Sequence, residues 1–229
     1  DLASLEEVLV GGADCPDALR RDFESRFGVP VVRTYGLTEA PALVALDDRD
    51  GPRPEGTSGR PLDHVEVTVR ADEIVLAPRP DGPWAGVYRP ALGYWGRPGA
   101  GRGVIDGRTL ATGDLGSLEG GHLKVRGRRS TVIIRGGANV YPAEVERVLV
   151  QAPGIGACAV AGVADERLGE RVGAAVEPGA GQAVDLREVL EFCRARLAAY
   201  KVPARMVVVD RLPRNQMGNV PPTEVARLL

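Results

Sequence analysis

A tyrosine, a threonine and a carboxylate stand close together after a short apolar run near the start of the chain. Tyr35, Thr38 and Glu39 follow Val31 and Val32, which predict a strand. This order puts a hydroxyl and a carboxylate at the carboxyl end of the strand, where open α/β sheets hold ligands. The same residues suit a structural role, with Tyr35 in a tyrosine corner and Thr38 capping a helix. From these residues alone, the two interpretations are equally supported.

Glycines form a second group of candidate residues. Gly11, Gly12 and Ala13 follow a predicted strand at residues 5–10, and they would let a flat ring lie against the backbone. A tight turn explains the two glycines just as well. Further along, Asp114 follows a glycine, an arrangement that is usual in turns.

Residues 123–146 combine a predicted strand, a turn, two glycines and a helix start in one short segment. Its first residues alternate as a strand, and residues 127–130 predict a turn before another apolar run. Gly136 and Gly137 leave bare backbone beside that run. Pro142 suits the first turn of a helix, where its missing N–H costs nothing.

Basic residues cluster within the same segment. Arg126, Arg128 and Arg129 lie at the end of the predicted strand. They are either ligand contacts or a solvated strand end.

The elements that must position these residues begin with a strand, a helix and a strand. Leu19, Phe23 and Phe27 recur at helical spacing, and Gly28 is a stop signal before the next predicted strand at residues 29–33. This order predicts part of an α/β layer.

The sequence pattern changes twice in the rest of the chain. Residues 51–110 combine Gly/Pro-rich turns with short alternating strands and predict a small, distorted β-barrel. Helices from Pro142 and Asp185, with strands at 159–161 and 206–209, then predict an independent α+β unit.

The composition is that of an ordinary globular protein. The 229 residues, 44% hydrophobic and 26% charged, suffice for one sizeable core or two modest ones. A formal net charge of -2 gives no reason to expect nucleic acid as a partner. No leader and no apolar run of membrane length occurs, and the 3 cysteines lack paired spacing. We therefore expect no membrane span, reduced thiols and a cytoplasmic location.

These motifs, in this order, resemble the adenylate-forming (AMP-binding) superfamily of acyl-CoA synthetases, peptide-synthetase adenylation domains and luciferases. Residues 35–39 match its Tyr-Gly-x-Thr-Glu motif, and residues 112–114 match its Thr-Gly-Asp motif. The resemblance covers essentially the whole chain. It implies the C-terminal half of an acyl-CoA synthetase, and Asp1 is not a natural start, so we expect a fragment.

The fold class implied by this resemblance is α/β plus α+β. Residues 1–50 would end the large α/β subdomain and residues 51–129 would form its distorted β-barrel. Residues 130–229 would be the small mobile C-terminal domain, with a hinge at 128–131. The segment at residues 93–98, Gly-Tyr-Trp-Gly-Arg-Pro, also resembles the family and is expected to pack within the barrel.

The resemblance also implies roles for individual residues. Tyr35 would stack on adenine, Thr38 would touch the α-phosphate, Glu39 would help to hold Mg²⁺ and Asp114 would accept hydrogen bonds from the ribose hydroxyls. An aromatic face suits a purine, and Mg²⁺ prefers few carboxylates plus phosphate oxygens. Arg128 would reach the same ribose. The implied nucleotide- and CoA-binding positions are Gly11, Gly12, Ala13, Tyr35, Gly36, Thr38, Asp114, Arg128, Gly136 and Gly137, of which the last two would border the pantetheine tunnel.

Two departures from the family pattern affect catalysis. The phosphate loop that ends in lysine lies upstream of anything present, and Asn219 occupies the position of the adenylation lysine. A neutral amide cannot supply the field of an ammonium group as negative charge shifts in the transition state. The implied catalytic positions are Asn219, Thr38 and Glu39.

The expected activity is that of an ATP-dependent acyl-CoA ligase in fatty acid metabolism, using ATP/AMP, Mg²⁺ and coenzyme A. Its partners would be a carboxylic acid, CoA and the missing N-terminal half, and this chain alone is expected not to adenylate. The alternatives are a non-catalytic nucleotide- or CoA-binding remnant and an engineered fragment that has lost adenylation.

Overall fold

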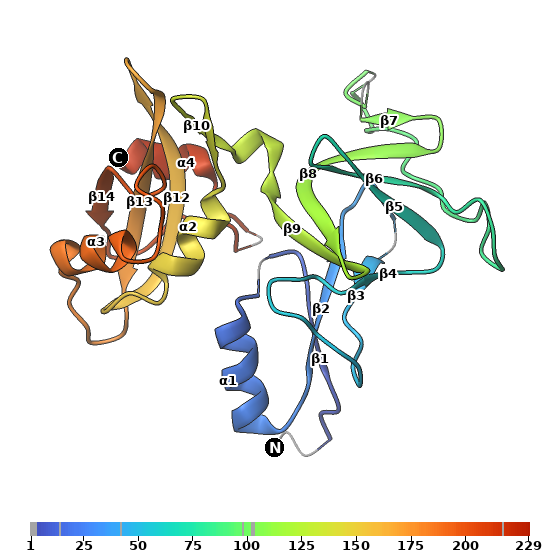
Figure 1. Ribbon diagram of the computed structural model, residues 1–229, viewed down its shortest axis with the longest axis horizontal. Coiled ribbons are helices and arrows are strands. Elements are labelled where there is room, and N and C mark those ends of the chain that lie inside the picture. Colours follow the sequence, from blue (N-terminus) through green and yellow to red (C-terminus); the bar gives the residue numbers. More distant parts are fainter. Residues whose placement is uncertain (1–3, 14, 42, 98, 102–103, 217) are drawn as a thin grey trace. The chain divides into compact units, whose positions relative to one another are not determined.

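The computed structural model describes the chain except for residues 1–3, 14, 42, 98, 102–103 and 217. Asp1, Pro98 and Met217, which the sequence interpretation includes, therefore lie outside the described residues. The chain forms two compact units, Asp1–Val125 and Arg126–Leu229 (Figure 1).

The first unit begins with a four-stranded sheet in the order β1-β2-β3-β4. Its elements are β1 (Val8–Val10), α1 (Asp17–Phe27), β2 (Val31–Gly36), β3 (Leu43–Leu46) and β4 (Arg60–Pro61). β1 and β2 are parallel and are joined by α1, which ends at Gly28 in the left-handed conformation. The predicted strand, helix and strand are confirmed.

The apolar stripe of α1 lies on the outside of the unit. Leu19 is 60% exposed and Phe27 is 44% exposed, whereas Arg20 of the same helix is buried. Arg20 is held by Glu24 at 3.3 Å. The sequence pattern therefore predicted the helix correctly, but its apolar stripe is not packed in the core of this unit.

A second, five-stranded antiparallel sheet carries most of the core of the first unit. Its strands are β5 (Val65–Arg70), β6 (Glu73–Pro78), β7 (Ile105–Asp106), β8 (Thr109–Glu119) and β9 (His122–Arg128). Ile74, Leu76, Leu110 and Leu123 are fully buried and join Tyr35 from the first sheet in one core cluster. The distorted barrel predicted for this region is a half-barrel, since no pairing within the described residues closes the sheet.

The second unit consists of one five-stranded sheet with helices on both faces (Figure 1). Its elements are the 3₁₀ turn η1 (Arg129–Thr131), β10 (Ile133–Arg135), β11 (Ala138–Val140), α2 (Pro142–Leu149), β12 (Ile155–Asp165), β13 (Gly169–Pro178), α3 (Leu186–Arg194), β14 (Arg205–Val208) and α4 (Pro222–Leu228). Because successive strand residues face opposite sides, Val160 packs against α2 and α3 while Ala159 packs against α4. The predicted α+β unit is confirmed.

One local prediction needs correction, and two elements were missed. The strand at 123–125 runs on to Arg128, so the turn predicted at residues 127–130 begins at Arg129 as η1. β13 and α4 were not predicted. Both elements lack a long apolar repeat: the small residues Gly173, Ala174 and Ala175 fill β13, and α4 has only seven residues.

Two helices begin at residues whose chemistry favours a helix N-terminus. Pro142 is the first residue of α2, as predicted, and the Asp185 side chain accepts a hydrogen bond from the Arg187 N–H at the start of α3. Cys193 on α3 is fully buried. None of the helices in the described part of the chain is long and apolar enough to cross a membrane.

Candidate functional site

The predicted nucleotide motif lies where β2 ends. β2 includes Tyr35 and Gly36, and a turn closed by the Ala40 N–H and the Leu37 carbonyl follows. Thr38 is exposed and Glu39 is half-buried within this turn. The hydroxyl and the carboxylate therefore lie beyond the carboxyl end of a strand, as the sequence predicted, and Thr38 caps no helix.

Tyr35 and Asp114 meet, although 79 positions separate them in the sequence. The Tyr35 hydroxyl donates a hydrogen bond to Oδ2 of Asp114 at 2.7 Å, and both side chains are buried. This contact links the first sheet to β8 of the second. It differs from a tyrosine corner, in which the hydroxyl bonds to backbone.

Asp114 lies inside a strand rather than in a simple turn. Its N–H donates to Oγ1 of Thr112 at 3.0 Å, and the Thr112 hydroxyl donates to the Ile74 carbonyl at 2.8 Å. Gly113 has a φ of 73°, and its N–H donates to Oε1 of Glu73 at 2.9 Å. These bonds fix the backbone that leads into Asp114.

The backbone conformation and close packing of the loop after β1 explain its two glycines. A Cβ on Gly11 would lie 2.2 Å from Oγ1 of Thr34, and Gly12 has a φ of 78°. Gly11, Gly12 and Ala13 are exposed. The structural explanation of the two glycines is therefore sufficient, and contact with an adenine ring stays a prediction.

Glu39 is tied to a segment more than fifty residues away. The Tyr94 hydroxyl donates to Oε1 of Glu39 at 2.6 Å, and the Ala91 N–H donates to the Glu39 carbonyl at 2.8 Å. Sequence reasoning missed this role of Tyr94. The Gly-Tyr-Trp motif was visible, but no local spacing connects it with Glu39.

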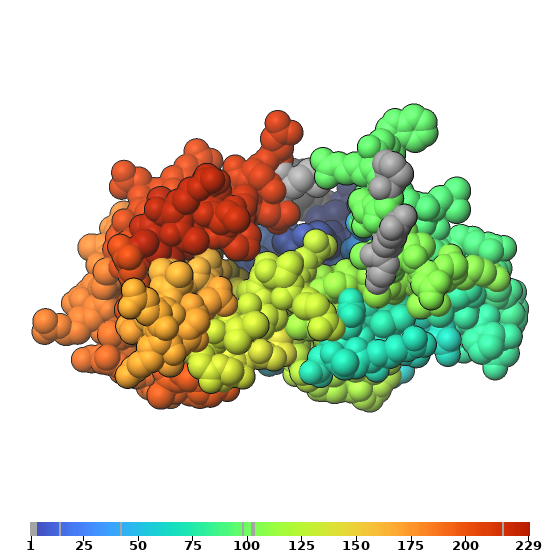
Figure 2. Space-filling view, turned by 90° about the horizontal axis from the view of Figure 1, so that it is seen from above, coloured from blue at the N-terminus to red at the C-terminus, as the bar shows by residue number. Residues whose placement is uncertain are grey.

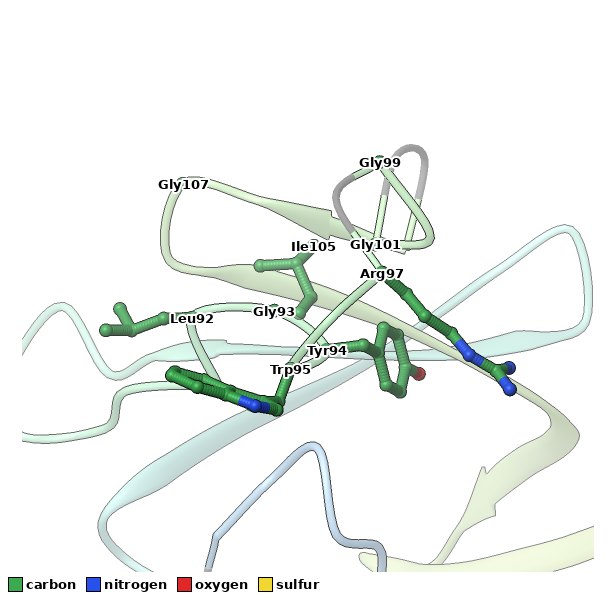
Figure 3. A pocket seen from close by; sticks show the side chains of 10 residues that line it. Leu92, Gly93, Tyr94, Trp95, Arg97, Gly99, Gly101, Ile105 and Gly107 are labelled. Atoms are coloured by element: carbon green, nitrogen blue, oxygen red, sulfur yellow. The ribbon is translucent and has the colours of Figure 1, made fainter.

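The segment around Tyr94 does not pack within the barrel, contrary to the sequence prediction. Tyr94 is 41% exposed, and Leu92 and Trp95 are fully exposed. These residues line an open hollow of about 630 Å³ with Arg97 and Ile105 (Figure 3). Gly93 and Gly96 flank Tyr94 and Trp95 and leave few side chains to bury, so the segment covers the surface instead of filling the core.

In the second unit, Gly136 and Gly137 form the two-residue turn of the β10–β11 hairpin. Their φ angles are 58° and 83°, which favours glycine at both positions. The Gly136 N–H donates to the Leu168 carbonyl at 2.7 Å. A Cβ on Gly137 would meet nothing within 4 Å, so the space beside this backbone is open.

The hairpin is anchored to the segment before β14. Nη1 of Arg135 donates to the carbonyls of Tyr200 at 2.5 Å and Ala199 at 3.3 Å. Nζ of Lys201 contacts both carboxylate oxygens of Glu144, at 2.6 and 2.8 Å. Burial disfavours the charge on Lys201, but the hydrogen bonds and charge of Glu144 raise its pKa above the ordinary value.

Asn219 lies on an exposed loop that is closed by its own backbone. The Asn215 N–H donates to the Asn219 carbonyl at 2.8 Å, and the Asn219 N–H donates to Oδ1 of Asn215 at 3.0 Å. Arg128 is exposed at the end of β9. The structure assigns these two residues to the second unit, whereas Tyr35 and Asp114 belong to the first.

The donor set at the end of β2 fits a nucleotide with magnesium. Among the described residues, no group of three or more His, Cys, Asp and Glu side chains forms a metal cage. Mg²⁺ bound with a nucleotide needs only one or two carboxylates, because phosphate oxygens supply further ligands. Glu39 is a half-buried carboxylate of this kind, with a donor already on one oxygen.

Comparison with known proteins identifies the family of the chain. Residues 1–83 match the family model of the AMP-binding enzymes, and residues 144–219 match that of the AMP-binding enzyme C-terminal domain. The 2-succinylbenzoate–CoA ligase of Geobacillus kaustophilus is 40% identical over 226 residues, which cover 97% of this chain and 46% of that ligase. The chain spans about half the length of the curated relatives it matches.

Solved structures share the fold. ATP-bound MatB from Rhodopseudomonas palustris has a TM-score of 0.83 and 30% identity, over 97% of this chain and 45% of that one. The amide bond synthetase McbA from Marinactinospora thermotolerans has a TM-score of 0.85 and 32% identity, over 100% and 47%. The sequence-based prediction is confirmed: the chain belongs to the adenylate-forming superfamily, and its relatives include acyl- and aryl-CoA ligases.

Proposed function

We propose that the chain is the C-terminal part of an ATP-dependent acid–CoA ligase. The reaction would join ATP and a carboxylic acid into an acyl-adenylate with release of pyrophosphate, after which the CoA thiol would displace AMP. The observation that carries this proposal is the 2.7 Å contact between Tyr35 and Asp114. It brings together the aromatic ring proposed for adenine and the carboxylate proposed for ribose.

The first unit would bind the nucleotide. Tyr35 would stack on the purine, with Gly11, Gly12, Ala13 and Gly36 lining it. Thr38 would contact the α-phosphate. Asp114 would accept from the ribose hydroxyls, and its fixed backbone supports that role because no rearrangement is needed on binding.

Glu39 would hold Mg²⁺ together with phosphate oxygens of ATP. The metal would neutralise phosphate charge as pyrophosphate leaves. In this step the chain would supply the Glu39 carboxylate in a fixed orientation.

The second unit would serve the thiol step. Gly136 and Gly137 would border pantetheine, and the open space beside Gly137 supports this. Arg128 would reach the ribose. We propose a hinge at residues 128–131 between a body of residues 1–129, comprising 1–50 and 51–129, and a mobile body of residues 130–229.

The first unit would pack against the N-terminal half of the ligase. The outward apolar stripe of α1 supports this, as does Leu9 on the edge strand β1, which is also exposed. Apolar residues gathered on a helix and an adjoining strand commonly mark a surface that another part of a protein covers.

A non-catalytic nucleotide-binding remnant is the second candidate, and Asn219 favours it. Without an ammonium group at this position, the shift of charge in adenylation lacks its electrostatic partner. Both candidates bind the nucleotide, but only the ligase converts a preformed acyl-adenylate and CoA into thioester once it is joined to an N-terminal half.

Nucleotide binding provides the direct test. In the 229-residue chain, Asp114→Asn is expected to raise the AMP dissociation constant about tenfold or more, because hydrogen bonds to a charged group are worth about 1.5–3 kcal/mol. The amide oxygen still accepts from Tyr35, so the fold is kept. Isothermal titration calorimetry with AMP and with 2′,3′-dideoxy-AMP measures the effect.

The dideoxy ligand separates ribose recognition from general damage. Wild-type chain should prefer AMP, whereas Asp114→Asn should bind both ligands equally. Asp106→Asn, which alters an exposed carboxylate in the same sheet, is the matched control and should behave as wild type. Absence of saturable AMP binding to the wild type would contradict the proposed function.

The hinge makes a separate prediction. Limited trypsin digestion should cut first after Arg128 or Arg129, because both side chains are exposed and the segment follows the boundary between the two units. Mass spectrometry of early products identifies the site. A first cut within α2, at Arg147, with the turn still intact would count against two separately moving bodies.

A further inference from the structure

Glu39 makes two contacts with one distant segment, through its backbone and through its side chain. The Ala91 N–H donates to the Glu39 carbonyl at 2.8 Å, and the Tyr94 hydroxyl donates to Oε1 at 2.6 Å. The first contact fixes the segment beside the turn that follows β2. The second contact determines where the carboxylate points.

The Tyr94 hydroxyl contact is not a by-product of core packing. Tyr94 is 41% exposed, and its neighbours Leu92 and Trp95 are fully exposed. Figure 3 shows Tyr94 on the same side of the segment as Arg97, away from Leu92 and Trp95. A tyrosine in such a place gains little from burial of its ring. The main contribution of Tyr94 is therefore the hydrogen bond of its hydroxyl, which a phenylalanine would lack.

A short hydrogen bond from a hydroxyl to an ionised carboxylate is a strong one. It also restricts rotation about the side-chain bonds of Glu39 before any ligand binds. A glutamate without this bond would lose that rotational freedom only on binding, at a cost in conformational entropy. With Oε1 engaged by Tyr94, Oε2 is the oxygen left to meet a cation. Carboxylates that ligate metals are usually oriented by such outer hydrogen bonds.

We propose that Tyr94 is a positioning residue, which orients the Glu39 carboxylate toward the metal ion that accompanies the bound nucleotide. This inference rests on the proposed function, in which Glu39 is a metal ligand. Tyr94 itself touches neither metal nor nucleotide. It acts by holding Glu39 in one orientation before the ligand arrives.

The test measures how much a metal ion improves ATP binding to the 229-residue chain. The dissociation constant of ATP is determined in EDTA and in excess Mn²⁺, and the ratio of the two is the metal contribution. Tyr94→Phe removes only the hydroxyl and is expected to lower this ratio about tenfold, the lower end of the range for losing an outer hydrogen bond to a ligand. Its ATP affinity in EDTA should stay at the wild-type value.

Two further variants calibrate the result. Glu39→Gln should abolish most of the metal contribution. Trp95→Phe changes an exposed aromatic next to Tyr94 and should leave both dissociation constants unchanged. The thermal unfolding midpoint of Tyr94→Phe should match the wild type, since the ring is not part of the core.

The outcomes are distinct. A lowered ratio in Tyr94→Phe with unchanged binding in EDTA supports the inference. An unchanged ratio in Tyr94→Phe, together with a lowered ratio in Glu39→Gln, overturns the role of Tyr94 and leaves the proposed function standing. If Mn²⁺ does not improve ATP binding to the wild type, the metal role of Glu39 fails and the inference about Tyr94 fails with it.

Discussion

Asn219→Lys is expected to raise the rate of acyl-adenylate formation about 10²-fold or more in a ligase that joins this chain to an N-terminal half. This is the scale associated with one preorganised electrostatic contact to charge that develops in the transition state. The thiol step should hardly change. In the proposed mechanism the second unit rotates for that step, which brings Gly136 and Gly137 near the thiol and carries residue 219 away.

The local structure allows this substitution. Hydrogen bonds between residues 215 and 219 use the backbone N–H and carbonyl of Asn219, so a lysine can take the position without loss of these bonds. The side chain is exposed, which leaves room for a longer one. The loop should therefore keep its conformation, and any change in rate can be attributed to the ammonium group.

The two steps can be measured separately. Carboxylate-dependent ATP–pyrophosphate exchange reports adenylation, and thioester formation from preformed acyl-adenylate and CoA reports the second step. Asn219→Gln, which lengthens the side chain without adding charge, is the control. If adenylation does not respond, or if both steps rise together, residue 219 is not in the position of the family lysine.

Short motifs were predictable because their meaning is local. Thr38 and Glu39 follow a strand within a few residues, and Pro142 begins a helix by its own geometry. Such features depend on neighbouring residues alone. The α+β unit was predicted from the same kind of evidence, although β13 and α4 were missed.

Contacts between distant residues were not predictable from patterns. Nothing near Tyr94 in the sequence indicates that its hydroxyl reaches Glu39, and nothing near Asp114 indicates that Tyr35 reaches it. The Tyr35–Asp114 pair depends on how two sheets share one core, and the Tyr94–Glu39 pair depends on how a segment outside both sheets lies beside the turn after β2. The exposure of Leu19 was missed for a related reason, since periodicity predicts an apolar face without predicting what covers it.

A buried ion pair between β2 and the residue that follows β3 was also missed. Nε of Arg33 donates to Oδ2 of Asp47 at 2.8 Å, and both side chains are almost completely buried. Nη1 of Arg33 also donates to Oδ1 of Asp17 at 2.8 Å. In the sequence, Arg33 only ended a predicted strand, because a single arginine gives no periodic signal of burial.

Removal of one partner of this pair is expected to destabilise the first unit strongly. Asp47→Leu should cost up to about 3–5 kcal/mol, because the buried guanidinium of Arg33 loses one of its two carboxylate partners and keeps only Asp17. Asp63→Leu is the matched control: Asp63 also pairs with an arginine, Arg79, at 3.7 Å, but its side chain is 83% exposed. A pair in solvent contributes little, so this control should remain close to the wild type.

The double variant Arg33→Met/Asp47→Leu should recover much of the loss, because replacing a buried ion pair by apolar residues of similar size is often neutral. Oδ1 of Asp47 is buried without a hydrogen-bond partner, which makes the native pair costly to keep. Asp17 retains a hydrogen bond from the Gly56 N–H at 2.7 Å when Arg33 is removed. Asp17 is therefore not left bare in the double variant.

Hydrogen exchange in increasing urea measures these effects within one unit. Peptides from β2 and β3 report the first unit, and peptides from β12 and β13 serve as an internal reference because they belong to the second. Separate readings are needed, since two units need not unfold in one transition. A double variant at least as unstable as Asp47→Leu would mean that the cost comes from lost packing around residue 47 and not from a stranded charge on Arg33.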